Sequence, residues 1–329
     1  AFVPAGTAFT VHVKEVDPTG TTQNEYDLSV PLDGTPVKSL NARGTGWTLV
    51  LSEPTFPSVP GVTFGTPVFT ASPGVVPSED GTTATATISP RTNVDVSLTN
   101  TAQLGSVTLT KSVTGGAAGL VDAAKTYSVT AKINTSSLGA NVPAQPDRTF
   151  TVTAGTPVTL DKLPIGAVVT FSEVRPTDDD QLTWGTPVFD PATVTVTAQN
   201  ATTPATVSLT NSVERTRGTF TLTKAVTGAQ AQNPAVPATV SVTASWTEEG
   251  GTAQTSTLTL PTNGTSVPFG QNLLIGTKVT LTETPLSDGS SIAWGAPVWS
   301  GTGVEVQGTS AVVTIGRNAE ASVTLENHA

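Results

Sequence analysis

One lysine in the sequence falls where the alternation of a β-strand turns it toward an apolar face. In TFTLTKAVTG, residues 219–228, apolar residues alternate with threonine, and Lys224 shares its face with Leu222 and Val226. Burying an unpaired ammonium costs several kcal/mol, so Lys224 is either a misread register, a side chain that reaches water at an edge, or a lysine with a special partner.

The same alternation of strand residues predicts that further polar residues point inward, at corresponding positions of the other repeats. Lys111 repeats the lysine on the face that carries Leu109 and Val113. Inward glutamates follow on later alternating segments, at Glu53, Glu173 and Glu283. Inward asparagines close the pattern at Asn100, Asn211 and Asn327. Two stretches of the chain therefore carry a lysine, a glutamate and an asparagine in that order.

These three residue types can react with one another in an apolar site. Burial lowers the pKa of a lysine and raises the pKa of a glutamate, so that both can be neutral at pH 7. A neutral amine is a nucleophile, and a protonated glutamic acid can donate to the asparagine carbonyl oxygen and pass its proton to leaving ammonia. The product is an amide between lysine Nζ and asparagine Cγ.

A simpler interpretation treats these as unrelated polar residues at strand ends, where a side chain reaches water past the rim of a sandwich. That interpretation suits any one of them. Their recurrence in type, order and phase favours the chemical interpretation, because uncompensated buried polar groups would remove much of a typical stability.

Internal repeats define the elements that must position these side chains. SVTLTKSVTG at 106–115 returns as TFTLTKAVTG at 219–228, and IGAVVTFSEVRP at 165–176 returns as IGTKVTLTETPL at 275–286. DVSLTNTA, TVSLTNSV and SVTLENHA close the copies, beginning at residues 95, 206 and 322. The repeats predict domains at 1–104, 105–217 and 218–329.

The composition predicts the fold class. Charged residues are 12 % of the chain, threonine and valine abound, and short alternating segments are separated by Gly, Pro, Asn and Asp. We expect an all-β protein of three tandem immunoglobulin-like β-sandwich domains, joined by short connections into a rod.

The first repeat lacks a counterpart of the lysine strand. AFVPAGTAFTVHV aligns with GLVDAAKTYSVTA at 119–131, and Lys14 corresponds to Lys132 and points outward. Glu53 and Asn100 are present in this repeat, but their partner lysine is absent from the chain. We expect the strand either just before residue 1 or on another chain.

The order of lysine, glutamate and asparagine, with IG before the glutamate strand, resembles the collagen-adhesin B-type domains of Gram-positive adhesins and pilins. The TLTK-VTG opening and the WGTPVF segment resemble a repeat family of actinobacterial surface proteins. The resemblance covers all three repeats. It implies spontaneous isopeptide bonds, with Glu173 and Glu283 as catalytic proton shuttles, and Glu53 in the same role where a lysine is supplied. The implied cross-links are Lys111 with Asn211 and Lys224 with Asn327.

We therefore expect a structural stalk or repeat region of an adhesin or fibre, extracellular on the cell surface of a Gram-positive bacterium. Its chemistry would be done once, on itself, so it would not be an enzyme. One alternative is a module that binds a host protein or glycan through loops or through Trp184 and Trp294. Another is a subunit of a surface layer or filament that assembles by strand donation between neighbouring subunits.

Other partners and sites have weaker support. The net charge of −10, with 15 Lys and Arg, disfavours nucleic acid, and cysteine is absent. No apolar run of about 18 residues predicts a membrane span. The acidic run TDDDQ at 177–181 and LSDGSS at 286–291 favour solvated loops over calcium sites. His12 and His328 are too far apart in sequence to suggest a pair, so no metal or cofactor is expected.

Overall fold

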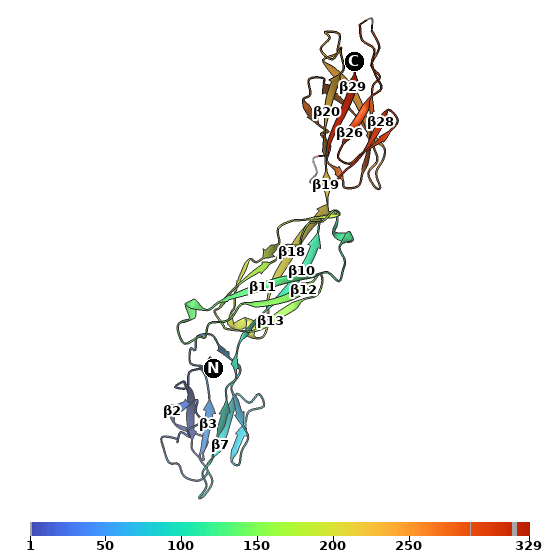
Figure 1. Cartoon of the computed structure of the whole chain (residues 1–329). Helices are drawn as coiled ribbons and strands as arrows, with labels where there is room; N and C mark the ends of the chain where they lie inside the picture. Colours follow the sequence, from blue (N-terminus) through green and yellow to red (C-terminus); the bar gives the residue numbers. More distant parts are fainter. Residues whose placement is uncertain (1, 290, 318–320) are drawn as a thin grey trace. The chain divides into compact units, whose positions relative to one another are not determined.

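The chain is built from β-strands (Figure 1). The structure is a computed structural model, and it describes residues 2–289, 291–317 and 321–329. Within these ranges the helical turns are short 3-10 helices, η1 (Ala118–Leu120), η2 (Ser136–Leu138) and η3 (Ala198–Ala201). The predicted all-β class is confirmed.

The chain divides into two compact units. One comprises Ala1–Ser112, Ala123–Val174 and Pro187–Thr210. The other comprises Val113–Asp122, Arg175–Thr186 and Asn211–Ala329. The division into three domains stays a prediction, and below "first", "second" and "third repeat" name the sequence segments 1–104, 105–217 and 218–329.

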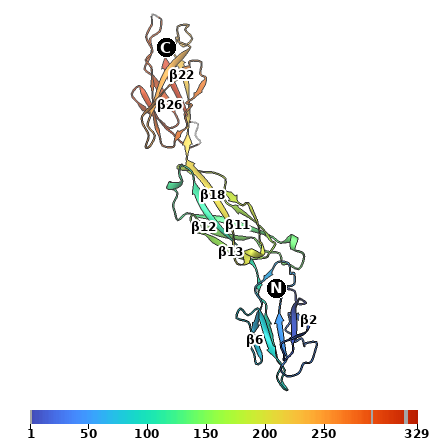
Figure 2. The same ribbon diagram turned by 180° about the vertical axis from the view of Figure 1, so that it is seen from behind.

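The third repeat consists of two sheets that share one core. The first sheet has the order β23-β20-β29-β26 and the second the order β22-β21-β25-β28-β27, and β19 pairs with β24. Figure 2 labels β26 of the first sheet and β22 of the second. Phe220 and Leu222 of one sheet pack in the same buried cluster as Val242 and Leu281 of the other, which makes a β-sandwich. The strands are β19 (Arg217–Gly218), β20 (Phe220–Thr227), β21 (Thr239–Trp246), β22 (Gln254–Pro261), β23 (Ser266–Pro268), β24 (Leu273–Leu274), β25 (Lys278–Glu283), β26 (Val298–Gly301), β27 (Val304–Gln307), β28 (Ser310–Thr314) and β29 (Ala321–His328).

The first and last strands of this repeat, β20 and β29, lie side by side and run parallel. Their register places Lys224 opposite Leu325 and Val226 opposite Asn327. Because alternate residues of each strand enter the core, Lys224 and Asn327 point into the same interior although 103 residues separate them in sequence.

The second repeat repeats this arrangement. One sheet has the order β13-β10-β18-β15, with β16 also paired to β18, and the other has the order β12-β11-β14-β17. The strands are β10 (Gly105–Thr114), β11 (Thr126–Asn134), β12 (Arg148–Thr153), β13 (Val158–Leu163), β14 (Val168–Glu173), β15 (Leu182–Trp184), β16 (Val188–Asp190), β17 (Thr193–Thr195) and β18 (Ala205–Arg215).

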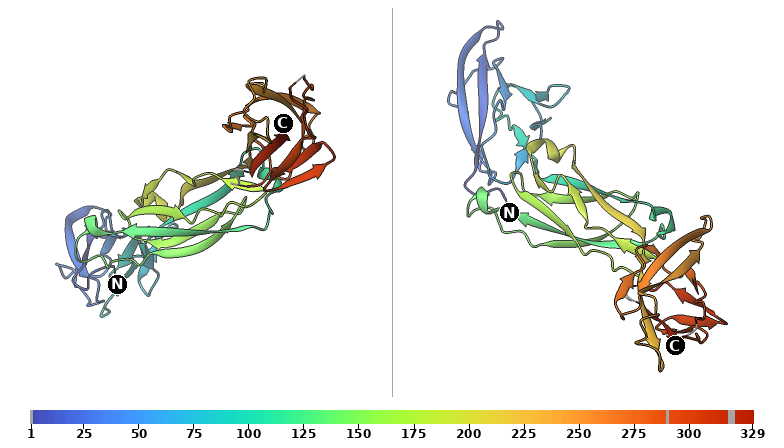
Figure 3. Two further views of the ribbon diagram at one scale, coloured as in Figure 1. Left: turned by 45° about the horizontal axis from the view of Figure 1, so that its top comes forward. Right: turned by 90° about the horizontal axis from the view of Figure 1, so that it is seen from above.

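The first repeat has one full sheet and two strand pairs. Its long β1–β2 hairpin, blue in Figure 3, belongs to a sheet of order β2-β1-β3-β7-β6, while β4 pairs with β9 and β5 with β8. The strands are β1 (Ala8–Val16), β2 (Thr22–Pro31), β3 (Thr48–Ser52), β4 (Thr63–Phe64), β5 (Val68–Thr70), β6 (Val75–Pro77), β7 (Thr83–Thr87), β8 (Ser97–Thr99) and β9 (Ala102–Gln103).

One edge of β8 is open in the described part of the chain. Phe69 of β5 pairs with Leu98 of β8 as Trp299 of β26 pairs with Leu325 of β29. The other side of β29 holds β20, whereas no described strand pairs with the other side of β8. Leu98 is accordingly half-buried, while Leu325 is fully buried. Among the described residues, the apolar face of the first repeat is therefore less covered at this edge than that of the third.

We predict that the backbone amides of β8 exchange with solvent much faster than those of β29. The reason is that an unpaired edge and a half-open core lower the free energy of local opening. Hydrogen–deuterium exchange mass spectrometry of peptides that cover 95–101 and 321–328 would measure the difference. Equal protection of the two segments would contradict it.

Candidate functional site

In the third repeat the predicted lysine, glutamate and asparagine meet inside the sandwich. Lys224 lies on β20, Glu283 at the end of β25 and Asn327 on β29, and these residues are 0, 6 and 2 % exposed. Lys224 Nζ donates to Asn327 Oδ1 and, at 2.9 Å, to the backbone oxygen of Ala225. The same nitrogen lies 3.8 Å from Glu283 Oε1.

The carboxyl group of Glu283 contacts both the amine and the amide. Its other oxygen, Oε2, accepts a hydrogen bond of 3.0 Å from Asn327 Nδ2. The sequence led us to expect the glutamate to donate to the asparagine carbonyl oxygen. The structure differs because Lys224 Nζ already donates to that oxygen, so the amide nitrogen faces the carboxyl.

Burial moves the pKa values of Lys224 and Glu283 toward each other. It lowers the pKa of Lys224 to about 8, against the opposing attraction of the Glu283 and Glu326 charges. It raises the pKa of Glu283, against the opposing effects of the hydrogen bond from Asn327 and the charge of Lys224. Both shifts lower the free-energy cost of the neutral amine and the neutral carboxylic acid relative to the buried ion pair.

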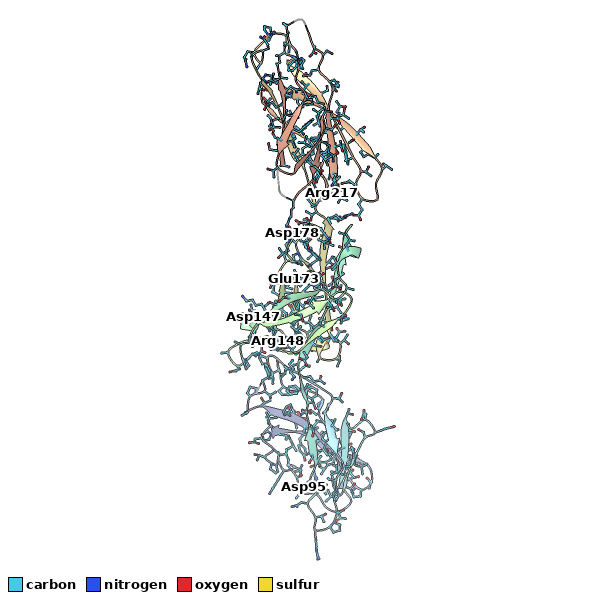
Figure 4. The ribbon with its side chains drawn as sticks, turned by 45° about the vertical axis from the view of Figure 1, so that its right-hand side comes forward. Asp95, Asp147, Arg148, Glu173, Asp178 and Arg217 are labelled. Atoms are coloured by element: carbon cyan, nitrogen blue, oxygen red, sulfur yellow. The ribbon has the colours of Figure 1, made fainter. Side chains whose placement is uncertain are left out.

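The second repeat brings its lysine and glutamate together in the same way. Lys111 Nζ on β10 lies 3.8 Å from Glu173 Oε2 on β14, and both side chains are fully buried. Burial lowers the pKa of Lys111 to about 8. Asn211 is fully buried on β18, the strand next to β10 in the sheet. Figure 4 marks Glu173 on the strands of this repeat.

Tyr127 is a member of the second site that the sequence analysis did not single out. The ammonium of Lys111 lies over its ring, 4.6 Å from the centroid. Burial and the charge of Glu173 raise the pKa of Tyr127 to about 12. Its parity with Val129 marks it as inward, but the sequence does not show which side chains of β11 lie against the lysine.

The first repeat holds half of the site. Asn100 Nδ2 donates to Glu53 Oε1 at 3.1 Å, so the predicted pair is in contact. Glu53 Oε2 and Asn100 Oδ1 are buried and have no hydrogen-bond partner among the described residues. Burial raises the pKa of Glu53, although the hydrogen bond from Asn100 opposes the shift. Lys14 is turned outward, as predicted, and pairs with Glu25 at 3.4 Å.

A buried glutamate on β1, Glu15, also escaped the sequence analysis. It is 0 % exposed and accepts hydrogen bonds from Tyr26, Asn41 and Arg43. Burial acts to raise its pKa, but the bonds from Arg43, Asn41 and Tyr26 outweigh burial and lower it. The inward parity of Glu15 was readable, since Lys14 points out, but its partners lie on other segments. The arrangement is that of a structural ion pair.

The acidic loop of the second repeat uses its carboxylates for its own turns. Asp178 Oδ1 accepts hydrogen bonds from Trp184 N at 2.8 Å and from Arg175 Nη2 at 2.7 Å. In the third repeat Asp288 accepts from Trp294 N at 2.8 Å in the same manner, and Ser290 of that segment lies outside the described residues.

The structure gives little support to the other binding and metal sites considered from the sequence. Trp184 is 3 % exposed, as a core residue should be, and Trp294 is half-buried. His12 forms a 2.9 Å contact with Asp27 across the β1–β2 hairpin. No three His, Asp or Glu side chains gather as metal ligands in the described ranges. Those ranges also contain no helix long and apolar enough to cross a membrane.

Comparison with known protein families identifies one that matches most of this chain. The model of a domain family of unknown function, DUF5979, matches residues 107–214 and 220–329, which together exceed half of the sequence. The chain belongs to the DUF5979 family. The two matches coincide with the second and third repeats, the two that carry all three residues of the predicted set. No curated protein matches the chain.

Several solved structures are similar to this DUF5979 chain. The Bacillus anthracis TIE protein shares 11 % identity at a TM-score of 0.34, over 98 % of this chain and 52 % of that one. This chain thus spans about half the length of the TIE protein. A Mobiluncus mulieris adhesin containing intramolecular disulfide, isopeptide and ester bond cross-links shares 16 % identity at a TM-score of 0.28, over 63 % and 86 %. The major pilin protein T-13 of Streptococcus pyogenes shares 11 % identity at 0.27, over 69 % and 97 %.

We predict that Glu53 makes the first repeat less stable as the pH rises. A carboxyl whose pKa is higher in the folded than in the unfolded state stabilises the fold fully below its ordinary value of 4.5, and this contribution is lost as the pH rises through the folded pKa. A tenfold difference between the two acid dissociation constants corresponds to about 1.4 kcal/mol. Glu53→Gln should remove this pH dependence and leave the repeat at least as stable at pH 7.

Urea titrations between pH 4 and 8, read by hydrogen exchange in peptides of the first repeat, would measure this effect. Glu79→Gln changes an exposed glutamate of the same repeat and serves as the matched control. A pH dependence that survives in Glu53→Gln but not in Glu79→Gln would refute the assignment.

Proposed function

We propose that this DUF5979 chain is a structural repeat segment of a bacterial cell-surface adhesin or fibre, whose repeats staple themselves by isopeptide bonds. The observation that carries the proposal is the buried contact of Lys224, Glu283 and Asn327 in the third repeat. Lys111 and Glu173 lie in the same relation in the second repeat.

The geometry of the third site supports a reaction in three steps. Glu283 Oε1 takes a proton from the Lys224 ammonium, which leaves a neutral amine beside the Asn327 carbonyl. Nζ then attacks Cγ, and the carboxylic acid delivers a proton to Nδ2, the atom that Oε2 already contacts at 3.0 Å. Collapse of the intermediate breaks the Cγ–Nδ2 bond and releases ammonia, and Nζ gives its surplus proton to the Glu283 carboxylate, which leaves a neutral amide beside a neutral acid.

The surroundings favour the product over the unreacted groups. An ammonium and a carboxylate in an apolar interior are costly, and the amide carries neither charge. The bond also closes a loop between β20 and β29, and a cross-link over roughly a hundred residues contributes about 4.7 kcal/mol in entropy models. Joining the first strand to the last makes the unfolded chain much more compact.

Such bonds suit a protein that must resist force and proteolysis. The chain has no cysteine, so it cannot use disulfides, and its chemistry is directed at itself. The resemblance to collagen-adhesin B-type domains supports an extracellular location on a Gram-positive surface. In this proposal the repeats act as a stalk, and their partners are neighbouring repeats or subunits of the same protein.

We predict that the purified chain weighs less than its sequence by two ammonia molecules, one each from the second and third repeats. Lys111→Ala and Lys224→Ala should each restore one ammonia, because the nucleophile is gone. Glu283→Gln should restore one by removing the proton shuttle. Intact-mass spectrometry, followed by tandem spectra of the cross-linked peptides, reads all of these variants.

Lys132→Ala and Lys278→Ala are matched controls, since both lysines are exposed strand residues of the same two repeats. Both control variants should keep the two losses. A measured mass equal to the sequence mass would show that no isopeptide bond has formed. Lys111 and Lys224 would then be ordinary buried lysines, and the proposal would be wrong.

We also predict that the second and third repeats do not unfold under force. A bond between the first and last strands carries the load past the rest of each sandwich, because force enters and leaves at these strands. Single-molecule pulling on the chain should give no full-length extension from either repeat. Lys224→Ala should add one event of the length of the third repeat, and a wild-type chain that already shows this event would disprove the mechanical role.

A further inference from the structure

Glu53 and Asn100 of the first repeat form a half-site, which we define as the glutamate and asparagine without the lysine. Each of the two side chains keeps one buried oxygen that accepts no hydrogen bond from the described residues. Asn100 donates to Glu53 through its amide nitrogen, as Asn327 does to Glu283. The remaining oxygens, Glu53 Oε2 and Asn100 Oδ1, are buried and lack a partner among the described residues. In the third repeat the corresponding two oxygens face Lys224 Nζ. Leaving buried acceptors unpaired is costly, so the half-site is suited to a cationic donor.

The way to this half-site lies along the open edge of β8. In the third repeat the strand beside β29 supplies Phe220 and Leu222 to the core as well as the lysine. In the first repeat the residues that would meet such a strand are half-buried, namely Leu49, Leu51, Val96 and Leu98. An unpaired strand edge and an incompletely covered apolar face together fit an extended segment.

We propose that the first repeat is an acceptor for a lysine-bearing β-strand supplied from outside this repeat, which enters beside β8 and becomes covalently joined to Asn100. The inference rests on the proposed function, because it assigns to Glu53 and Asn100 the roles proposed for Glu283 and Asn327.

The pattern of the occupant follows from the strands that fill this place in the other repeats. Both β10 and β20 present apolar, apolar, lysine and apolar residues at alternate positions, within SVTLTKSVTG and TFTLTKAVTG. The parallel register of β20 on β29 sets the lysine opposite Leu325, which corresponds to Leu98. A segment of this pattern covers the apolar face and delivers its ammonium to the unpaired oxygens.

The covalent step is balanced without any further reactant. Glu53 takes a proton from the ammonium, the amine attacks Asn100 Cγ, and the protonated carboxyl passes that proton to Nδ2. The Glu53 carboxylate then takes the surplus proton of the attacking nitrogen, so the new amide is neutral. The new Nζ–Cγ bond replaces the Cγ–Nδ2 bond, and one ammonia leaves. No atom changes its oxidation state.

The test uses the whole chain and the synthetic peptide GTFTLTKAVTGA, residues 218–229. After incubation at pH 7, the chain should gain the peptide mass less one ammonia, and tandem spectra should place the link at Asn100. A peptide with Lys224→Arg keeps the charge and the strand pattern but offers no nucleophile, and it should bind without forming an adduct. Asn100→Ala in the chain should abolish the adduct.

Glu53→Gln should slow the adduct about a hundredfold or more while a fluorescent peptide still binds, which separates proton transfer from folding of the repeat. Asn24→Ala, at an exposed asparagine of β2, should react as wild type. The mass of the untreated chain reports the second and third repeats independently. Two ammonia losses without a peptide adduct would overturn this inference and leave the proposed function standing. Reversible binding alone, or a link at another residue, would also overturn it.

Discussion

The arrangement of the repeats depends on the cost of burying an ammonium. Lys224 is fully enclosed in a sandwich core, where a lone charge would offset a large part of the stability of a typical domain. The carboxyl of Glu283 and the amide of Asn327 reduce this cost, and their positions on two further strands require the sandwich to be folded before the three groups meet. The site is therefore a product of the tertiary fold.

The topology makes the contact possible. The first strand of the third repeat lies parallel to the last, and a parallel pair must be connected through other elements of the domain. Here the connection is most of the repeat, including the second sheet that brings Glu283. Hence two side chains that share a strand register lie at opposite ends of the repeat sequence, the placement in which a cross-link restrains the unfolded chain most.

Much of this could be predicted from alternation and repetition. The alternation with a period of two predicted the inward face of each strand. The recurrence of lysine, glutamate and asparagine predicted that the three side chains meet at one buried site, as they do in the third repeat. The orientation of the asparagine amide could not be predicted from the sequence, because it depends on whether the lysine or the glutamate donates to Oδ1 in the folded site. Tyr127 and the Arg43 partner of Glu15 were missed for a related reason, since each contacts its charged neighbour from another segment.

Two buried glutamates of the first repeat show why burial alone does not define a reactive acid. Glu15 receives hydrogen bonds from a tyrosine, an asparagine and an arginine, and these hold its pKa below the ordinary range in spite of burial. Glu53 receives one from Asn100, and burial raises its pKa. The number and charge of the donors thus separate a carboxylate that fastens a hairpin from a carboxyl able to carry a proton. By this criterion Glu53 belongs with Glu283, although no described side chain reaches its second oxygen.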